Sequence, residues 1–172
     1  MNAYLRQVFW RSLIVHLPIL ACLLAGRWQA ALGCLGLTAA VMCYATLSPS
    51  TRLFGPVVKS IGPPGVLLTL DDGPDPITTP AVLDLLDRYQ AGAVFFLIGD
   101  RVNQWPELAR EIIRRGHAVA NHSQTHPAGS FWSLGPWRVW REIAGCQETL
   151  TRVLGVPGTW FRAPVGHYNH HV

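Results

Sequence analysis

The sequence predicts an α/β domain with parallel strands that follows one or two membrane helices. Three observations support this prediction. The chain of 172 residues is 49% hydrophobic and 14% charged, and its longest uncharged stretches lie near the amino terminus. A segment rich in proline and glycine follows them. Beyond that segment, short apolar runs alternate with helical patterns, which is the order found in α/β folds with right-handed crossovers.

Residues 1–51 are the predicted membrane anchor. Residues 28–51 carry no charge, and as a helix they would be roughly 36 Å long, enough to cross an apolar core of about 30 Å. Residues 12–26 are also uncharged, but they number 15 and include Pro18. They could form a short first span, a re-entrant segment or the apolar part of a signal peptide. A second apolar stretch and the lack of an A-x-A site favour an anchor over a cleaved signal.

The orientation of the anchor depends on the number of spans. With one span, more basic residues precede it than follow it, so the positive-inside rule places the domain outside the cytoplasm. With two spans, the basic residues at the outer ends outnumber Arg27 in the turn and keep the domain in the cytoplasm; they are Arg6, Arg11, Arg52 and Lys59. We predict a bacterial inner membrane protein whose domain faces the periplasm, as in the one-span case.

Composition also excludes some functions. Residues 52–65 are a predicted linker, because proline and glycine recur there. The formal net charge of +4 comes from scattered Lys and Arg, so we expect no nucleic-acid partner. The four cysteines show no CxxC spacing, which excludes a disulfide framework and a cysteine metal site.

The predicted domain covers residues 66–172. Apolar runs predict strands at 66–70, 93–99, 117–121 and 159–163. Proline, glycine and helical periodicity predict helices at 80–91, 106–115 and 136–154, with Thr79 as the cap of the first. The inward faces are expected to be Val82, Leu83, Leu86 and Tyr89 in the first helix, and Trp137, Trp140, Ile143, Ala144 and Leu150 in the last.

Polar side chains follow three of these strands, where parallel α/β folds place their chemistry. Asp71 and Asp72 follow the first strand, and Arg162 stands where it could pair with a carboxylate and hold it ionised. His122 and His126 follow the third strand, and on a helical turn both would lie on one face. With a carboxylate they would form a metal site suited to hydrolysis. Each of these residues also has a simpler interpretation. The two aspartates could belong to a turn, the two histidines to a polar surface, and Arg162 to an exposed loop.

The motifs "TLDDGP", "NHSQTH" and "RAPVG", in this order, resemble the first three motifs of the polysaccharide deacetylase family. This family is also called the NodB-homology family or carbohydrate esterase family four. The run "AVFFLIG" is similar to the family's second strand, and the resemblance extends from about Gly65 to Asn169. It implies a distorted (β/α) barrel and a divalent metal ion, commonly zinc.

The resemblance also implies roles for single residues. By position, the metal ligands would be Asp72, His122 and His126. Asp71 would be the general base that activates the attacking water, and Arg162 would orient it. The backbone amide of Val165 would help to stabilise the oxyanion. The implied enzyme is a hydrolase of non-peptide carbon–nitrogen bonds. Its substrate would be an N- or O-acetylated polysaccharide, peptidoglycan or lipid-linked glycan.

The sequence departs from the family pattern at three points. Leu70 replaces the usual Phe, and Val165 replaces an aromatic residue of the third motif. The fourth and fifth motifs, which include the general-acid His, have no counterpart before Val172. We therefore expect a domain truncated to about half a barrel. The alternative is a catalytically inactive, truncated membrane protein that retains only the metal half-site.

Overall fold

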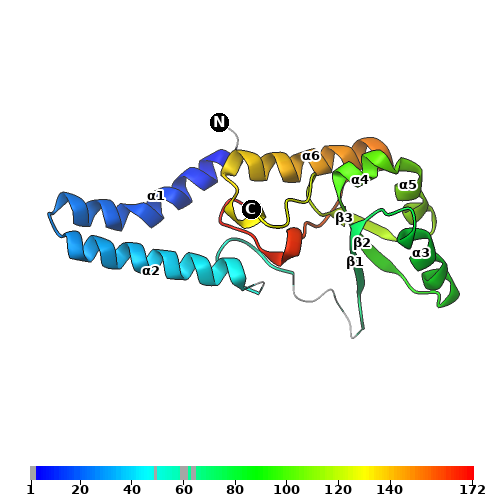
Figure 1. Ribbon diagram of the computed structural model, residues 1–172, viewed down its shortest axis with the longest axis horizontal. Helices are drawn as coiled ribbons and strands as arrows, with labels where there is room; N and C mark the ends of the chain where they lie inside the picture. Colours follow the sequence, from blue (N-terminus) through cyan, green and yellow to red (C-terminus); the bar gives the residue numbers. More distant parts are fainter. Residues whose placement is uncertain (1–2, 49, 59–61, 63–64) are drawn as a thin grey trace.

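The computed structural model describes residues 3–48, 50–58, 62 and 65–172. Two amino-terminal helices, α1 (Ala3–Leu24) and α2 (Trp28–Leu47), lie side by side as a hairpin that projects from the α/β domain (Figure 1). The predicted linker is described only in part, and its residues 59–61 and 63–64 lie outside the described residues.

The hairpin corrects the predicted bounds of both apolar segments. Residues 12–24 of the uncharged stretch 12–26 belong to the longer helix α1, which has Pro18 inside it, and residues 25 and 26 lie in the turn after it. Helix α2 ends at Leu47, because Ser48 is extended (φ −99°, ψ 100°) and precedes Pro49, and the residue before a proline disfavours the helical region. Among the described residues, α2 is the one helix long and apolar enough to cross a membrane.

The leucines of the hairpin are mostly exposed. Large apolar side chains point outward from both helices; among them are Leu17, Leu20, Leu23, Leu32, Leu35, Leu37 and Leu47. Exposed apolar side chains that gather on neighbouring helices are typical of surfaces that meet a membrane or another protein.

The domain is built on a parallel sheet in the order β1-β2-β3. Its strands are β1 (Leu68–Gly73), β2 (Ala93–Leu97) and β3 (Ala118–Asn121). Helix α3 (Thr78–Arg88) connects β1 to β2, and helices α4 (Gly99–Gln104) and α5 (Pro106–Arg114) connect β2 to β3. Helix α6 (Pro136–Leu154) follows β3. The four helices gather on one side of the sheet (Figure 1).

The central strand β2 is buried along its whole length. Phe95 and Leu97 face the helices, where they join Leu83 of α3 and Leu150 of α6 in the main core. The alternate residues of β2 face the other side of the sheet and form a smaller cluster with Ala120. Burial on both faces explains why this strand reads as an unbroken apolar run.

Two predicted helix faces are partly wrong. Leu83 and Leu86 of α3 are buried as expected, but Tyr89 lies past the end of the helix and is exposed. In α6 the buried residues are Val139, Cys146, Thr149 and Leu150, whereas Trp137 is exposed. Positions 137 and 139 are about 200° apart around a helix, so they occupy opposite sides. The tryptophans have the spacing of a core stripe, but Trp137 lies on the solvent side and Trp140 is only half-buried.

The start of α3 also differs from the prediction. Thr79 does not cap this helix but lies inside it, and its hydroxyl accepts a hydrogen bond from the Asp75 N–H at 2.9 Å. The N-cap position is Ile77, and just ahead of it the Oδ1 of Asp75 accepts the N–H groups of Ile77 and Thr78 at 3.0 and 2.8 Å. These bonds, led by the one from Thr78, lower the pKa of Asp75.

The predicted fourth strand, residues 159–163, is a single bridge between Phe161 and Asn121. The Asn121 N–H donates to the Trp160 carbonyl at 2.9 Å, and the Arg162 N–H donates to the Asn121 carbonyl at 3.0 Å. Pro164 follows and has no N–H with which to extend the ladder. The sequence predicts half a barrel with four strands. Within the described residues, the structure has three strands and one bridge.

We predict that Leu83→Ala lowers the free energy of unfolding by about 2–5 kcal/mol, because it leaves a cavity in the main core. Leu85→Ala is the matched control: it makes the same change in the same helix at a side chain that is 52% exposed. It should cost less than about 0.5 kcal/mol. Urea titration of the full chain in detergent, followed by near-UV circular dichroism, measures both. Equal losses would contradict this core assignment.

Candidate metal centre

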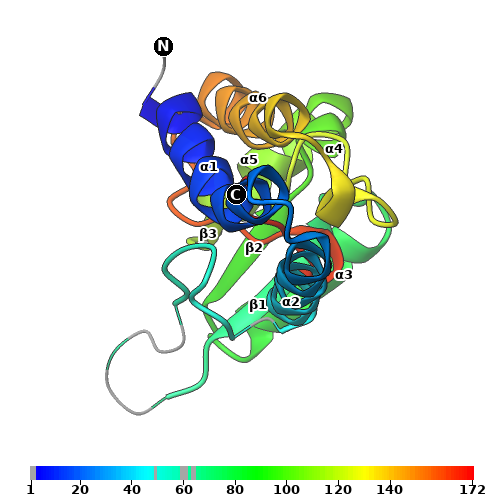
Figure 2. The same cartoon turned by 90° about the vertical axis from the view of Figure 1, so that its left-hand side faces the viewer.

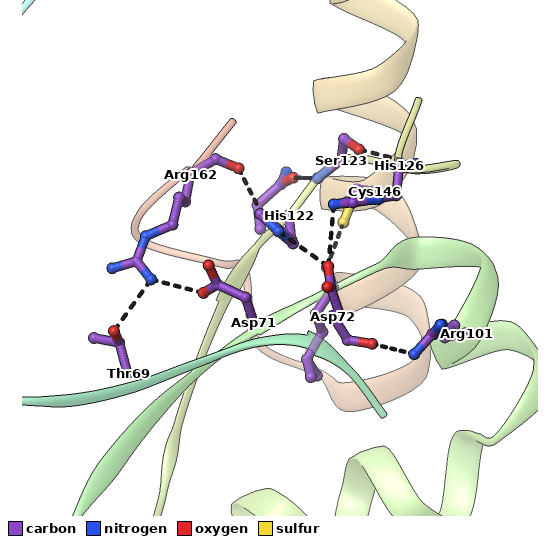
Figure 3. Close-up of polar contacts among 11 residues, drawn as sticks. Thr69, Asp71, Asp72, Arg101, His122, Ser123, His126, Cys146 and Arg162 are labelled. Atoms are coloured by element: carbon purple, nitrogen blue, oxygen red, sulfur yellow. Dashed lines mark hydrogen bonds and ion pairs between the residues drawn. The ribbon is translucent and has the colours of Figure 1, made fainter. Parts of the chain in front are cut away.

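Adjacent carboxylates at the end of β1 point to different partners. The strand does not end at Leu70 as predicted but runs through Asp71 and Asp72 to Gly73. Leu70 pairs with Phe95 and Gly73 with Leu97, so β1 advances by three residues over the distance in which β2 advances by two. Such an irregularity re-aims side chains. As a result Asp71 points toward Arg162, while Asp72 points toward the two histidines (Figure 3).

His122 and His126 lie in a loop, and the predicted helical turn is wrong. Ser123 and His126 both have left-handed backbones, with φ of 71° and 54°. The Ser123 hydroxyl accepts the His126 N–H at 3.1 Å, and the Asn121 side-chain oxygen accepts the Ser123 N–H at 2.9 Å. Glu142 of α6 accepts both the N–H and the hydroxyl of Thr125. These bonds fold the loop so that the two imidazole rings lie 4.8 Å apart.

Three side chains converge on one point from β1 and this loop. Asp72 Oδ1 is 3.0 Å from His126 Nε2 and 3.3 Å from His122 Nε2, and the three ligand atoms all lie within 4.8 Å of one another. Ligands at about 2.0–2.1 Å from a tetrahedral zinc ion stand about 3.3 Å apart. Within the described part of the chain, this is the group of donors that could hold one ion. The residues fit a metal of the zinc type.

The main chain fixes the orientation of His122. Its Nδ1 lies 2.8 Å from the Arg162 carbonyl oxygen, which can only accept, so Nδ1 carries the hydrogen. The unprotonated Nε2 then faces Asp72, in the arrangement that protein metal sites use to orient a histidine ligand. Burial is the main cause that lowers the pKa of His122. The neutral imidazole, which is the form that binds metal, is therefore favoured.

Arg162 also holds the second carboxylate. Its Nη1 lies 2.6 Å from Asp71 Oδ1 and 3.1 Å from the Thr69 hydroxyl. The guanidinium carbon stands 4.0 Å over the centre of the Phe96 ring. Contacts on two sides therefore fix the guanidinium and, through it, the direction of the Asp71 carboxylate.

Sequence reasoning missed three contributors to this site. Thr69 lies two residues before Asp71, and alternation along a strand could have placed it on the same face. Phe96 belongs to an apolar run with nothing to distinguish it. Arg101 in α4 donates to the Asp72 carbonyl at 2.5 Å, and no sequence signal marks it.

Val165 lies close to the site along the chain. It belongs to the short helix η2 (Pro164–Gly166), three residues after Arg162, with a left-handed backbone (φ 51°) and an exposed side chain. Its expected role in binding an oxyanion stays a prediction.

Comparison with known proteins assigns the chain to a family. Residues 59–172 match the family model described as polysaccharide deacetylase. A chitooligosaccharide deacetylase of Sinorhizobium fredii is 50% identical over 108 residues, which are 58% of this chain and 49% of that protein. The solved peptidoglycan deacetylase PdaC of Bacillus subtilis has a TM-score of 0.57 at 36% identity, covering 60% of this chain and 51% of that one. A family 4 carbohydrate esterase from Streptomyces lividans, solved with acetate, has a TM-score of 0.57 at 35% identity, and the match covers 62% of this chain and 54% of that one. The chain thus spans about half the length of these proteins.

We predict that His122→Gln and His126→Gln each weaken zinc binding by more than about 100-fold, because each would remove a candidate direct ligand, and even the loss of an outer partner costs about 10–100-fold. Competition with a coloured chelator, on the full chain in detergent, measures the affinity. His167→Gln is the control, since it changes a histidine outside the triad. Equal weakening by the control, or no zinc binding by the parent chain, would contradict the assignment.

Proposed function

Because the chain belongs to the polysaccharide deacetylase family, we propose that it removes acetyl groups from a carbohydrate by metal-assisted hydrolysis. The observation that carries this proposal is the division between adjacent carboxylates. Asp72 faces the two histidines, while Asp71 faces an arginine. One carboxylate is thus available to bind metal, and its neighbour remains available to accept a proton.

The proposed ligands are Asp72, His122 and His126, with zinc as the proposed metal. Two imidazoles and one carboxylate suit zinc and leave coordination positions open. A bound divalent ion would supply Lewis-acid chemistry, polarising the acetyl carbonyl and making water a stronger acid.

Asp71 is the proposed general base. Such a base must be ionised and must lie within hydrogen-bond reach of the proton it accepts. Arg162, which also donates to the Thr69 hydroxyl, fixes where the Asp71 carboxylate points. We include the backbone amide of Val165 as the oxyanion donor, because preorganised N–H groups stabilise charge that develops in the transition state.

The proposed substrates are N-acetylated amino-sugar polymers or lipid-linked glycans. Relatives named as chitooligosaccharide and peptidoglycan deacetylases support amino-sugar polymers. We further propose that residues 1–51 anchor the domain of residues 66–172 in a bacterial inner membrane, on its periplasmic side. The exposed leucines of α1 and α2 support an anchor in lipid.

The direct test is acetate release from an N-acetylated chito-oligomer by the zinc-loaded chain. Asp71→Asn should lower the rate about 10²–10⁴-fold, the usual contribution of a general base, while zinc binding persists. Asp87→Asn, which changes a surface carboxylate paired with Arg115, is the control and should leave the rate unchanged. A chain that binds zinc yet releases no acetate from any acetylated glycan would favour the inactive membrane protein instead.

A second variant separates the two functions of Arg162. Arg162→Gln removes the guanidinium that holds Asp71 but keeps the backbone carbonyl that orients His122. We expect kcat to fall about 10–100-fold, as for other outer partners of such sites, with zinc affinity unchanged. Parallel titration with zinc and assay of acetate release checks both parts. Loss of zinc binding would show that the side chain, not the carbonyl alone, supports the ligands.

A further inference from the structure

Exposed tryptophans gather where α6 begins. Trp132 in the short helix η1 (Phe131–Ser133) is 50% exposed, and Trp137 in the first turn of α6 is 58% exposed. Trp137 stacks on the half-buried Trp140, with ring centres 5.0 Å apart and planes at 18°. The core side of α6 is formed by other residues. These three tryptophans, with Arg138 and Arg141, are called the aromatic face below.

The aromatic face is also basic. Arg138 and Arg141 alternate with the stacked tryptophans along α6, and both side chains are exposed. Within the described residues, neither guanidinium has a carboxylate within ion-pairing distance. Apolar rings next to unpaired positive charges complement a surface that has anionic groups outside and an apolar layer beneath them.

The aromatic face lies on the side of the domain that carries the hairpin. In Figure 1, the gold end of α6 is its amino-terminal end and points toward α1 and α2. Figure 2 looks at the molecule from the hairpin side, and the yellow segment before α6 lies on this near side. The far end of α6 points away, toward α5 (Figure 1).

The chain that leaves α2 is held against the domain. The Tyr168 hydroxyl donates to the Thr51 carbonyl at 3.2 Å. The Phe54 side chain is 3% exposed, and its ring lies 5.8 Å from that of Tyr168 and 6.3 Å from that of His170. These contacts keep the domain close to the end of α2, so a bilayer crossed by α2 would come near the aromatic face.

We propose that the aromatic face docks on the surface of the bilayer that α2 crosses, with lipid phosphates as the partners of Arg138 and Arg141. Tryptophan suits the membrane interface, because its ring is apolar while its N–H seeks a polar partner. Anionic lipids attract basic side chains near the surface. This inference rests on the proposed membrane anchor but not on the proposed deacetylation.

The test uses the full chain reconstituted in vesicles of phosphatidylcholine and phosphatidylglycerol, with and without bromine on the phosphatidylcholine acyl chains near the headgroup. Bromine quenches tryptophan emission only at short range. The spectrum of the variant Trp132→Phe/Trp137→Phe/Trp140→Phe is subtracted from that of the parent chain, which leaves the emission of the aromatic face. We expect more than half of this difference emission to be lost in brominated vesicles.

Two further variants complete the experiment. Trp105→Phe is the matched control, because Trp105 lies between α4 and α5 and is 37% exposed; its difference emission should be quenched by iodide in the water and not by bromine. Arg138→Gln/Arg141→Gln should reduce the bromine quenching of the aromatic face at least twofold.

Three results would overturn the proposal. If iodide quenches the difference emission and bromine does not, the aromatic face lies in water; if a chito-oligomer then protects that emission from iodide, the face is a sugar-binding surface. Bromine quenching that the arginine variant leaves unchanged would contradict lipid phosphates as the partners of the arginines. A lack of bromine quenching in every variant would contradict the proposed membrane anchor. Since acetate release plays no part in the readout, each of these outcomes leaves the test of the deacetylase separate.

Discussion

The candidate site depends on one short backbone contact, the bridge between Asn121 at the end of β3 and the segment that carries Arg162. Two hydrogen bonds, at 2.9 and 3.0 Å, make this bridge. Arg162 then acts at both of its ends: its carbonyl orients the His122 ring, and its guanidinium holds Asp71. The Asn121 side chain also contributes, because its oxygen shapes the loop that ends in His126. The two histidines and the proposed proton acceptor Asp71 thus share one support.

The fold was predictable where a single local signal, such as an apolar run or a proline at a helix start, decides the structure and tertiary contacts do not override it. The three strands follow from apolar runs, and α5 and α6 begin at Pro106 and Pro136 as expected. Helix α4 was not predicted, since it has six residues and too few turns to show a period. The face of α6 was misjudged because Trp137 counts as apolar in a periodic pattern although its ring lies outside the core. Segment 159–163 has the composition of a strand, but pairing depends on tertiary contacts that composition does not contain.

Five residues of the candidate site were predictable in identity, but Thr69, Phe96 and Arg101 were not, and neither was the geometry. Motif order and residue chemistry point to the carboxylates, the two histidines and Arg162. The spacing of His122 and His126 suggested a helix, whereas a loop of left-handed residues brings the rings together. Nothing local predicts the irregularity in β1 that turns Asp71 and Asp72 to different partners. Likewise, the bond from His122 to the Arg162 carbonyl joins residues 40 positions apart, and any residue at 162 would supply the same carbonyl group.

The left-handed backbone at Asp72 and His126 places stability and function in conflict during evolution. Their φ values of 66° and 54° belong to a region where glycine is relaxed and where Asn, Asp and His are the best tolerated of the other residues. Selection for a stable fold alone would therefore favour drift toward glycine at both positions, and each such change would remove a carboxylate or an imidazole from the candidate site. Laboratory evolution for heat resistance should reach these two positions early, and a library in which both may vary would lose candidate metal ligands in exchange for a less strained backbone.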